Sequence, residues 1–213
     1  MAKLSKGILG GISGKIGNIV GASWRGIDYI RSKPSKVNNP KTEAQQRQRA
    51  RFGLIMALLK KMKPFLQIGF RGSANKQTPL NAAMSVNIRE AITGEFPDFE
   101  VDTSKLAVST GNLHGSSNAS LDLSAAENAT ITWQSEAGIS NASDEDVLMV
   151  LLYNQARNEV INKLNAALRE DETLSLSIPS SWSGDTVAGY LAFRSDTLND
   201  VSNGIYLGEE VAA

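Results

Sequence analysis

Residues 146–154 read DVLMVLLYN, and every position from Val147 to Leu152 is apolar. A strand with one face in water alternates apolar and polar side chains, so an uninterrupted apolar run of this length is typical of a strand that is buried on both faces. We therefore expect these residues to form the central strand of a sheet, with the sequence on either side supplying its neighbours.

Short apolar or alternating runs flank this stretch, and glycine, serine, asparagine and aspartate, the usual residues of turns, separate them. Trp133 ends one alternating run, as a core anchor would. Six or seven strands in about a hundred residues predict an all-β sandwich. The flanking runs are SKLAVSTGNL (104–113), NASLDLS (118–124), ATITWQ (129–134), TLSLSIPSSW (173–182), TVAGYLAFRS (186–195) and SNGIYLG (202–208).

This strand pattern resembles an immunoglobulin or fibronectin type III domain over residues 103–208. We expect the complete sandwich domain to occupy residues 96–213. The stretch NEVINKLNAALRED (158–171) fits a strand pair or a short helix, and both assignments stay open.

Residues 38–95 predict a helical segment with two helices. Asn39 would cap the first helix and Pro40 would be its first residue. Pro64 should break or kink this helix, because proline removes a helical hydrogen bond. Apolar residues recur at helical spacing along one face, at Phe52, Ile55, Leu59 and Met62.

The second helix should begin at Thr78-Pro79, again a capping residue followed by proline. It should run to about Thr93, because Gly94 follows and glycine commonly ends a helix.

Residues 1–37 form a basic, glycine-rich arm. Seven glycines lie between positions 7 and 26, and each costs about 1 kcal/mol in an exposed helix, so a stable helix is not expected. The β-branched and aromatic residues that follow suit a strand or hairpin with a turn near Arg25-Gly26. Such a segment buries little surface by itself, so we expect it to be ordered against a partner. The predicted fold class is thus α+β: a basic arm and two helices, followed by an all-β sandwich.

Charge divides the chain in two. Residues 1–72 hold 15 lysines and arginines and only two acids, whereas residues 73–213 hold 7 lysines and arginines and 20 acids. Such asymmetry indicates a partner for the basic part, either nucleic acid or an acidic protein surface. Here an acidic surface is available in the chain itself or in a neighbouring copy.

The residues that most enzymes need are scarce. There is no cysteine and a single histidine, His114, in a Gly/Ser/Asn-rich stretch, where a solvated residue is the usual reading. The stretch GGISGKIGNIVG (10–21) resembles a phosphate-binding loop, but Leu9 and Ile16 stand where its first glycine and its hydroxyl belong. We expect no enzyme activity, no cofactor, no metal site and no small-molecule substrate.

No apolar stretch is long enough for a membrane-spanning helix, and the first residues lack the apolar core of a signal peptide. The expected location is the cytoplasm, or a virion or other particle assembled there.

The stretch GKIGNIVGASWRGIDYIRSKPSKVNNPKTEAQQRQRARF (14–52) resembles the opening of an uncharacterised domain family from Bacteroidota genomes. Members share a G-K-x-G-N-x-V-G-x-x-W-[KR]-G stretch, an I-R-x-x-P segment and an N-P-[KR]-T-x-A-Q run before a β-rich half. The resemblance implies no activity. It implies that the arm and the start of the first helix are the distinctive part.

We expect a non-enzymatic structural protein that self-assembles head-to-tail, as a homo-oligomeric ring or filament such as a phage virion or tail-like particle. Its basic arm would engage the acidic sandwich of a neighbouring copy by strand addition. Trp24, Arg25, Tyr29 and Arg31 are the predicted contact residues of the arm.

The alternative is a nucleic-acid-binding accessory protein. The arm and the arginine-rich helix would then contact phosphates, through Arg47, Arg49 and Arg51, while the aromatic residues of the arm stack on bases.

Overall fold

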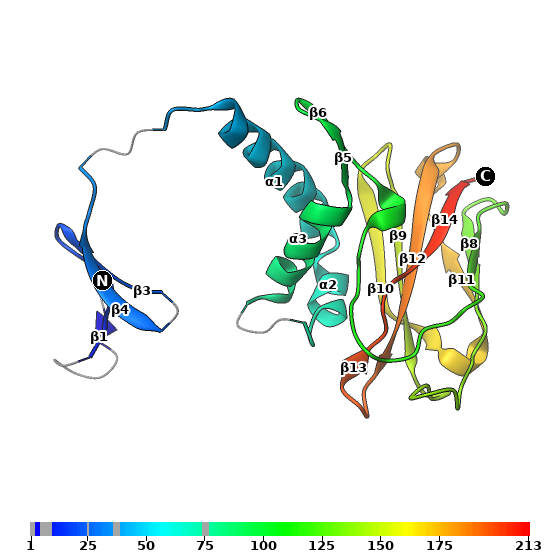
Figure 1. Ribbon diagram of the computed structural model, residues 1–213. Helices are drawn as coiled ribbons and strands as arrows, with labels where there is room; N and C mark the ends of the chain where they lie inside the picture. Colours follow the sequence, from blue (N-terminus) through cyan, green and yellow to red (C-terminus); the bar gives the residue numbers. More distant parts are fainter. Residues whose placement is uncertain (1–2, 5–9, 25, 36–38, 74–76) are drawn as a thin grey trace. The chain divides into compact units, whose positions relative to one another are not determined.

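A computed structural model describes residues 3–4, 10–24, 26–35, 39–73 and 77–213 of the chain. The chain forms two compact units, residues 1–42 and residues 43–213, shown in Figure 1. Unit 1 is a small sheet, and unit 2 contains the helices and a β-sandwich, so the fold class is α+β.

Unit 1 is an antiparallel sheet in which each strand pairs with the next along the chain. Two-residue connections join its last three strands, since Ile16 pairs with Ile19 and Trp24 pairs with Ile27. Gly26 lies in the second of these turns with φ +86°, a conformation that favours glycine. The strands are β1 (Lys3–Leu4), β2 (Ile12–Ile16), β3 (Ile19–Trp24) and β4 (Ile27–Ser32).

Strands β2 and β3 approach each other closely at Gly21. A Cβ added at Gly21 would lie 2.0 Å from the carbonyl oxygen of Ile12, so only glycine fits on β3 at this point. Strands β3 and β4 form the hairpin that the sequence predicts, with its turn at Gly26, and the described residues of β1 and β2 extend it to a meander.

Unit 2 contains a β-sandwich whose strands pair antiparallel throughout. One sheet has the order β10-β9-β12, with β13 and β14 both on the far side of β12, and the other has the order β11-β8-β7. The finer likeness to immunoglobulin or fibronectin III domains stays a prediction. The strands are β7 (Ser120–Asp122), β8 (Asn128–Thr132), β9 (Val147–Asn154), β10 (Glu159–Leu168), β11 (Thr173–Ser177), β12 (Thr186–Ser195), β13 (Asp200–Val201) and β14 (Ile205–Val211).

The larger sheet is buried on both sides. Leu148, Val150 and Leu152 of β9 pack between the two sheets, whereas Met149 and Leu151 pack against the helices. The uninterrupted apolar run that predicts a central strand is therefore confirmed. The helices form a third layer on the sandwich, and they share one hydrophobic core with it (Figure 1).

The helical segment contains three helices, α1 (Glu43–Lys61), α2 (Lys63–Gly69) and α3 (Pro79–Glu90), where two were predicted. The expected break at Pro64 is present, and the residues beyond it form α2. The expected start at Pro40 is wrong, because Lys41 has φ +50° and cannot belong to a right-handed helix. The cap of α3 is confirmed, since the Thr78 side chain accepts a hydrogen bond from the amide of Asn81.

Two segments differ from the prediction. The end of the second predicted helix is instead the start of a hairpin, β5 (Ile92–Glu95) and β6 (Asp98–Val101), in which Gly94 has φ +78° within β5. The run 104–113 is not a strand, because it begins within the short 3₁₀ helix η1 (Thr103–Lys105) and continues as a loop. The open stretch 158–171 is strand β10 followed by η2 (Arg169–Asp171), and η3 (Ser180–Trp182) follows β11.

A buried arginine joins the loops at one end of the sandwich. Arg169 is fully buried, and its Nε lies 3.1 Å from a carboxylate oxygen of Asp146. Its terminal nitrogens donate to the carbonyl oxygens of His114, Gly115 and Ser135 at 2.7–3.0 Å. Burial lowers the pKa of Arg169, and the charge of Asp146 opposes that shift.

Replacing this arginine should destabilise unit 2 strongly. Arg169→Met leaves the Asp146 carboxylate buried without its cation, so we expect the free energy of unfolding to fall by about 3–5 kcal/mol. Lys105→Met is the control, because Lys105 pairs with Asp102 at 2.9 Å on the surface and its loss should cost at most about 1 kcal/mol. Urea denaturation of both variants measures the difference, and equal losses would contradict this role for Arg169.

Candidate interaction surface

The register of unit 1 assigns its side chains to two faces. Directly paired residues of an antiparallel sheet lie on the same face. Val20 pairs with Lys15 on one side and Arg31 on the other, Ala22 pairs with Tyr29, and Trp24 pairs with Ile27. We call the surface formed by these seven residues the cationic face.

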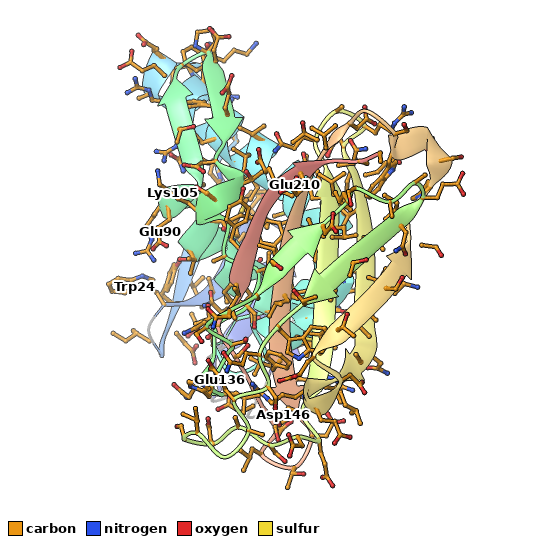
Figure 2. The ribbon with its side chains drawn as sticks, turned by 90° about the vertical axis from the view of Figure 1, so that its right-hand side faces the viewer. Trp24, Glu90, Lys105, Glu136, Asp146 and Glu210 are labelled. Atoms are coloured by element: carbon orange, nitrogen blue, oxygen red, sulfur yellow. The ribbon has the colours of Figure 1, made fainter. Side chains whose placement is uncertain are left out.

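Aromatic and basic groups occupy different ends of the cationic face. Trp24, Ile27 and Tyr29 line an open hollow of about 310 Å³ near the Gly26 turn. These side chains are 62%, 66% and 43% exposed, and Figure 2 shows Trp24 pointing away from its strand. Three of the four predicted contact residues, Trp24, Tyr29 and Arg31, thus share one face, and the fourth, Arg25, lies outside the described residues.

The opposite side of the sheet carries isoleucines. Ile16 pairs directly with Ile19, and Ile30 is the diagonal neighbour of Ile19 across β3 and β4. Their side chains are 47–59% exposed. We call this surface the isoleucine face. Both sides of the sheet therefore present large apolar side chains to solvent.

The three arginines of the first helix do not form one surface. Arg47 and Arg51, four residues apart, lie on the side of α1 that faces the β5–β6 hairpin, where they line a pocket of about 280 Å³ together with Phe99. The Arg51 guanidinium lies 5.8 Å from the centre of the Phe99 ring and donates to the carbonyl oxygen of Ile88 at 2.8 Å. Arg51 is therefore a packing residue between α1, α3 and the hairpin.

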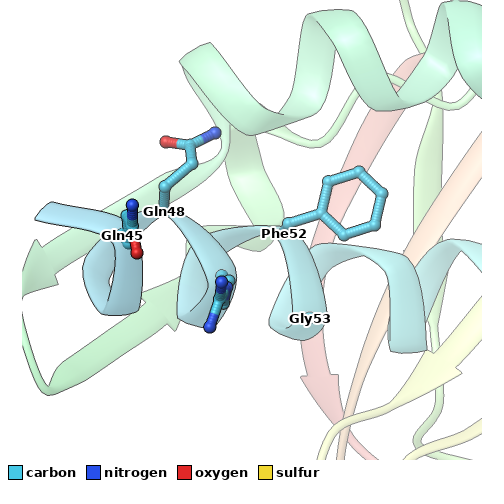
Figure 3. A pocket seen from close by; sticks show the side chains of 5 residues that line it. Gln45, Gln48, Phe52 and Gly53 are labelled. Atoms are coloured by element: carbon cyan, nitrogen blue, oxygen red, sulfur yellow. The ribbon is translucent and has the colours of Figure 1, made fainter. Parts of the chain in front are cut away.

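Arg49 belongs to a different surface. It lines an open, mostly apolar hollow of about 390 Å³ along α1, together with Gln45, Gln48, Phe52 and Gly53. Figure 3 shows Gln48 and Phe52 projecting from the same side of the helix. Phe52, which the sequence places on the buried face of the helix, is 48% exposed, so the core begins one turn later, at Ile55.

The single histidine lies in a polar loop cluster. The His114 Nε2 is 2.8 Å from a carboxylate oxygen of Glu136, whose other oxygen accepts from the hydroxyl of Ser117. These contacts, that of Ser117 first, lower the pKa of Glu136. The serine donates to the glutamate and not to the imidazole, so the arrangement is not that of a nucleophile beside its base.

In the part of the chain that the structure describes, no group of three or more histidines, cysteines or carboxylates is placed to hold a metal ion. None of the described helices combines the length and the apolar character that crossing a membrane requires.

Comparison with protein families gives one match. The model of DUF6266, a family of unknown function, covers residues 11–208. The chain is a member of DUF6266. No curated protein matches the chain. The resemblance of residues 14–52 to an uncharacterised family is thus confirmed, while its attribution to Bacteroidota stays a prediction. Because the DUF6266 match extends from Gly11 to Gly208, both units belong to the family's common sequence.

Because Arg49 and Arg51 lie on different surfaces of α1, replacing each of them should affect the stability of unit 2 differently. Arg51→Ala removes a hydrogen bond and a cation–π contact, so the free energy of unfolding should fall by about 1–2 kcal/mol. Arg49→Ala, on an exposed surface of the same helix, should change it by no more than about 0.5 kcal/mol. Urea denaturation tests this, and a larger loss at Arg49 than at Arg51 would show that the assignment of the two surfaces is wrong.

Proposed function

We propose that this DUF6266 protein is a non-enzymatic structural protein that self-assembles head-to-tail into a homo-oligomeric ring or filament. A phage virion or tail-like particle is one assembly of this kind. In the proposal, the sheet of unit 1 in one copy engages unit 2 of the next. The observation that carries the proposal is the exposure of large apolar side chains on both faces of this sheet.

Within the described residues of unit 1, the sheet is a single layer, whereas a sheet of this size needs a second one. Six of the eleven large apolar side chains that are exposed among the described residues lie between Ile16 and Ile30. Burying one such side chain stabilises a protein by about 1.5–3 kcal/mol, and small sheets are stable only with a covered apolar face. A surface of this kind on a soluble domain is typical of an interaction site. It supports assembly as the source of the missing layer.

Charge supports a heterologous contact between the two kinds of unit. Residues 1–42 hold eight lysines and arginines and one acid, Asp28, whereas residues 43–213 hold 14 lysines and arginines and 21 acids. Two copies of unit 1 would repel each other, while unit 1 and unit 2 attract. A contact between different surfaces of identical chains is head-to-tail, and it produces rings or filaments.

The second candidate function is nucleic-acid binding, and one observation favours it. Trp24 and Tyr29 lie on the same face as Lys15 and Arg31, and aromatic side chains beside cations are how many proteins hold single-stranded nucleic acid. The helix contributes less to this candidate than the sequence suggests, because Arg51 is used in packing.

Light scattering tests the proposed assembly. The mass of the full-length protein should rise with concentration above that of one chain, and deletion of residues 1–42 should return it to the monomer. Unit 2 should fold without this segment, because both of its core clusters lie within residues 55–212, and circular dichroism checks that it does.

A pair of substitutions keeps the test valid if the deletion misfolds. Trp24→Ser with Ile27→Ser should lower the mass. Ile139→Ser with Leu198→Ser, which change side chains of 52% and 54% exposure in unit 2, should not. A monomer at every concentration would contradict the proposal. Salt-sensitive binding of an oligonucleotide by that monomer would favour the second candidate.

A further inference from the structure

Most carboxylates of the sandwich already have partners within unit 2. Asp146 pairs with Arg169, Asp185 with Arg157 at 2.6 Å, and Asp196 with Arg194 at 2.8 Å. Other acids accept hydrogen bonds from the same unit; for example, Glu159 accepts from the Trp182 indole at 2.8 Å. Most carboxylates of the sandwich therefore have an interaction partner within their own unit.

The β5–β6 hairpin is different. Glu95 lies directly opposite Asp98, and Glu100 lies opposite Thr93, so three carboxylates share one face of the hairpin. They are exposed, and in the described chain no hydrogen bond or ion pair to their side chains is found. Like charges that lie directly opposite each other destabilise a strand pair. We call this surface the carboxylate face.

The other face of the hairpin packs against the helices. Phe99 lies on that face, where it contacts Arg51 of α1, and Ile92 and Val101 pack against the helical core. The hairpin is therefore held by α1 through one face, and its carboxylates lie on the other face, where Glu95 also borders the pocket that Arg47 and Arg51 line. Two-stranded hairpins are marginally stable without such support.

The cationic face of unit 1 carries the opposite charge. Lys15 and Arg31 both lie beside Val20, and among the residues that the structure describes neither forms an ion pair. We infer that the cationic face of one copy docks on the carboxylate face of the β5–β6 hairpin of a second copy. This inference rests on the proposed function, and it names the surface that receives unit 1.

The order of groups along the two surfaces agrees. Along β3, Val20 lies beside the two cations, and Trp24 lies four residues further on, or about 13 Å at the rise of a strand. Along the hairpin, Glu100 is followed by the Glu95–Asp98 pair and then by the exposed tip residue Pro97. When the cations meet the carboxylates, the apolar tip therefore points toward the hollow between Trp24 and Tyr29. Charge pairs with charge, and apolar surface with apolar surface.

Cysteine crosslinking between separately purified copies tests the contact. The chain has no cysteine, so every introduced thiol is unique. A Val20→Cys copy, with its thiol on the cationic face, is mixed with a Thr93→Cys copy, with its thiol on the carboxylate face, and treated with a short bis-maleimide. The expected product is a mixed dimer, which can form only between copies.

The matched control moves the first thiol by one residue. Ile19→Cys lies next to Val20 on β3 but on the isoleucine face, and with Thr93→Cys it should give at least about tenfold less mixed dimer, since neighbouring strand residues point to opposite faces. Reaction with a mono-maleimide confirms that each thiol is accessible. Equal yields from the two mixtures would overturn the inference. So would crosslinking confined to single chains that carry both Val20→Cys and Thr93→Cys.

Charge reversal gives an independent readout by light scattering. Glu95→Lys, Asp98→Lys and Glu100→Lys together should weaken assembly at least about tenfold, because like charges across an interface oppose binding. Adding Lys15→Glu and Arg31→Glu to the same chain should restore it. Reversing Glu127, Glu145 and Glu210, three exposed acids elsewhere on unit 2, changes the net charge equally and should leave the mass unchanged.

The outcomes separate this inference from the proposed function. If the deletion of residues 1–42 lowers the mass but the hairpin reversal does not, the proposed function stands and the inference is overturned. If the wild type is monomeric throughout, both fail. If Lys15→Glu with Arg31→Glu abolishes binding of a single-stranded oligonucleotide and leaves the mass unchanged, nucleic acid occupies the cationic face and the inference is overturned.

Discussion

The constraint on which this account depends is a sheet that, among the described residues of unit 1, has a single layer. Unit 1 has regular strand pairing and defined turns, but its large apolar side chains lie at 43–66% exposure on both faces. Strand pairing satisfies the backbone, whereas the stability of a small sheet comes from covering its apolar side chains. In the proposed assembly a partner surface supplies this cover, and the excess of cations in unit 1 favours an acidic one.

Unit 2, which receives unit 1 in the proposed assembly, has a well-packed core. Its central strands are buried on both sides, and Arg169 ties three loop carbonyls and Asp146 together at one end of the sandwich. The hairpin is attached to α1 through the contact of Arg51 with the Phe99 ring. Most sandwich carboxylates have partners within unit 2, whereas the β5–β6 hairpin gathers three exposed carboxylates on one of its faces.

The sequence predicts the parts of this structure that depend on local patterns. The apolar run at 146–154 identifies the central strand, and Thr78-Pro79 identifies the start of α3. The hairpin is missed because Gly94 is read as a helix end, while it lies within a strand that pairs across the chain. The division of Arg49 from Arg51 depends on which side of α1 meets the hairpin, and the shared face of Trp24 and Arg31 depends on strand register. Neither can be read from spacing alone.

The environment of Trp24 is the most direct test of the central claim. The chain has three tryptophans, and the other two, Trp133 and Trp182, are only 4% and 1% exposed. The difference spectrum between the wild type and Trp24→Phe therefore reports the fluorescence of an exposed indole. We predict that its emission shifts to shorter wavelength, and that its quenching by acrylamide weakens, as the protein concentration rises and the sheet is covered. An emission typical of a solvated indole at every concentration would contradict the account.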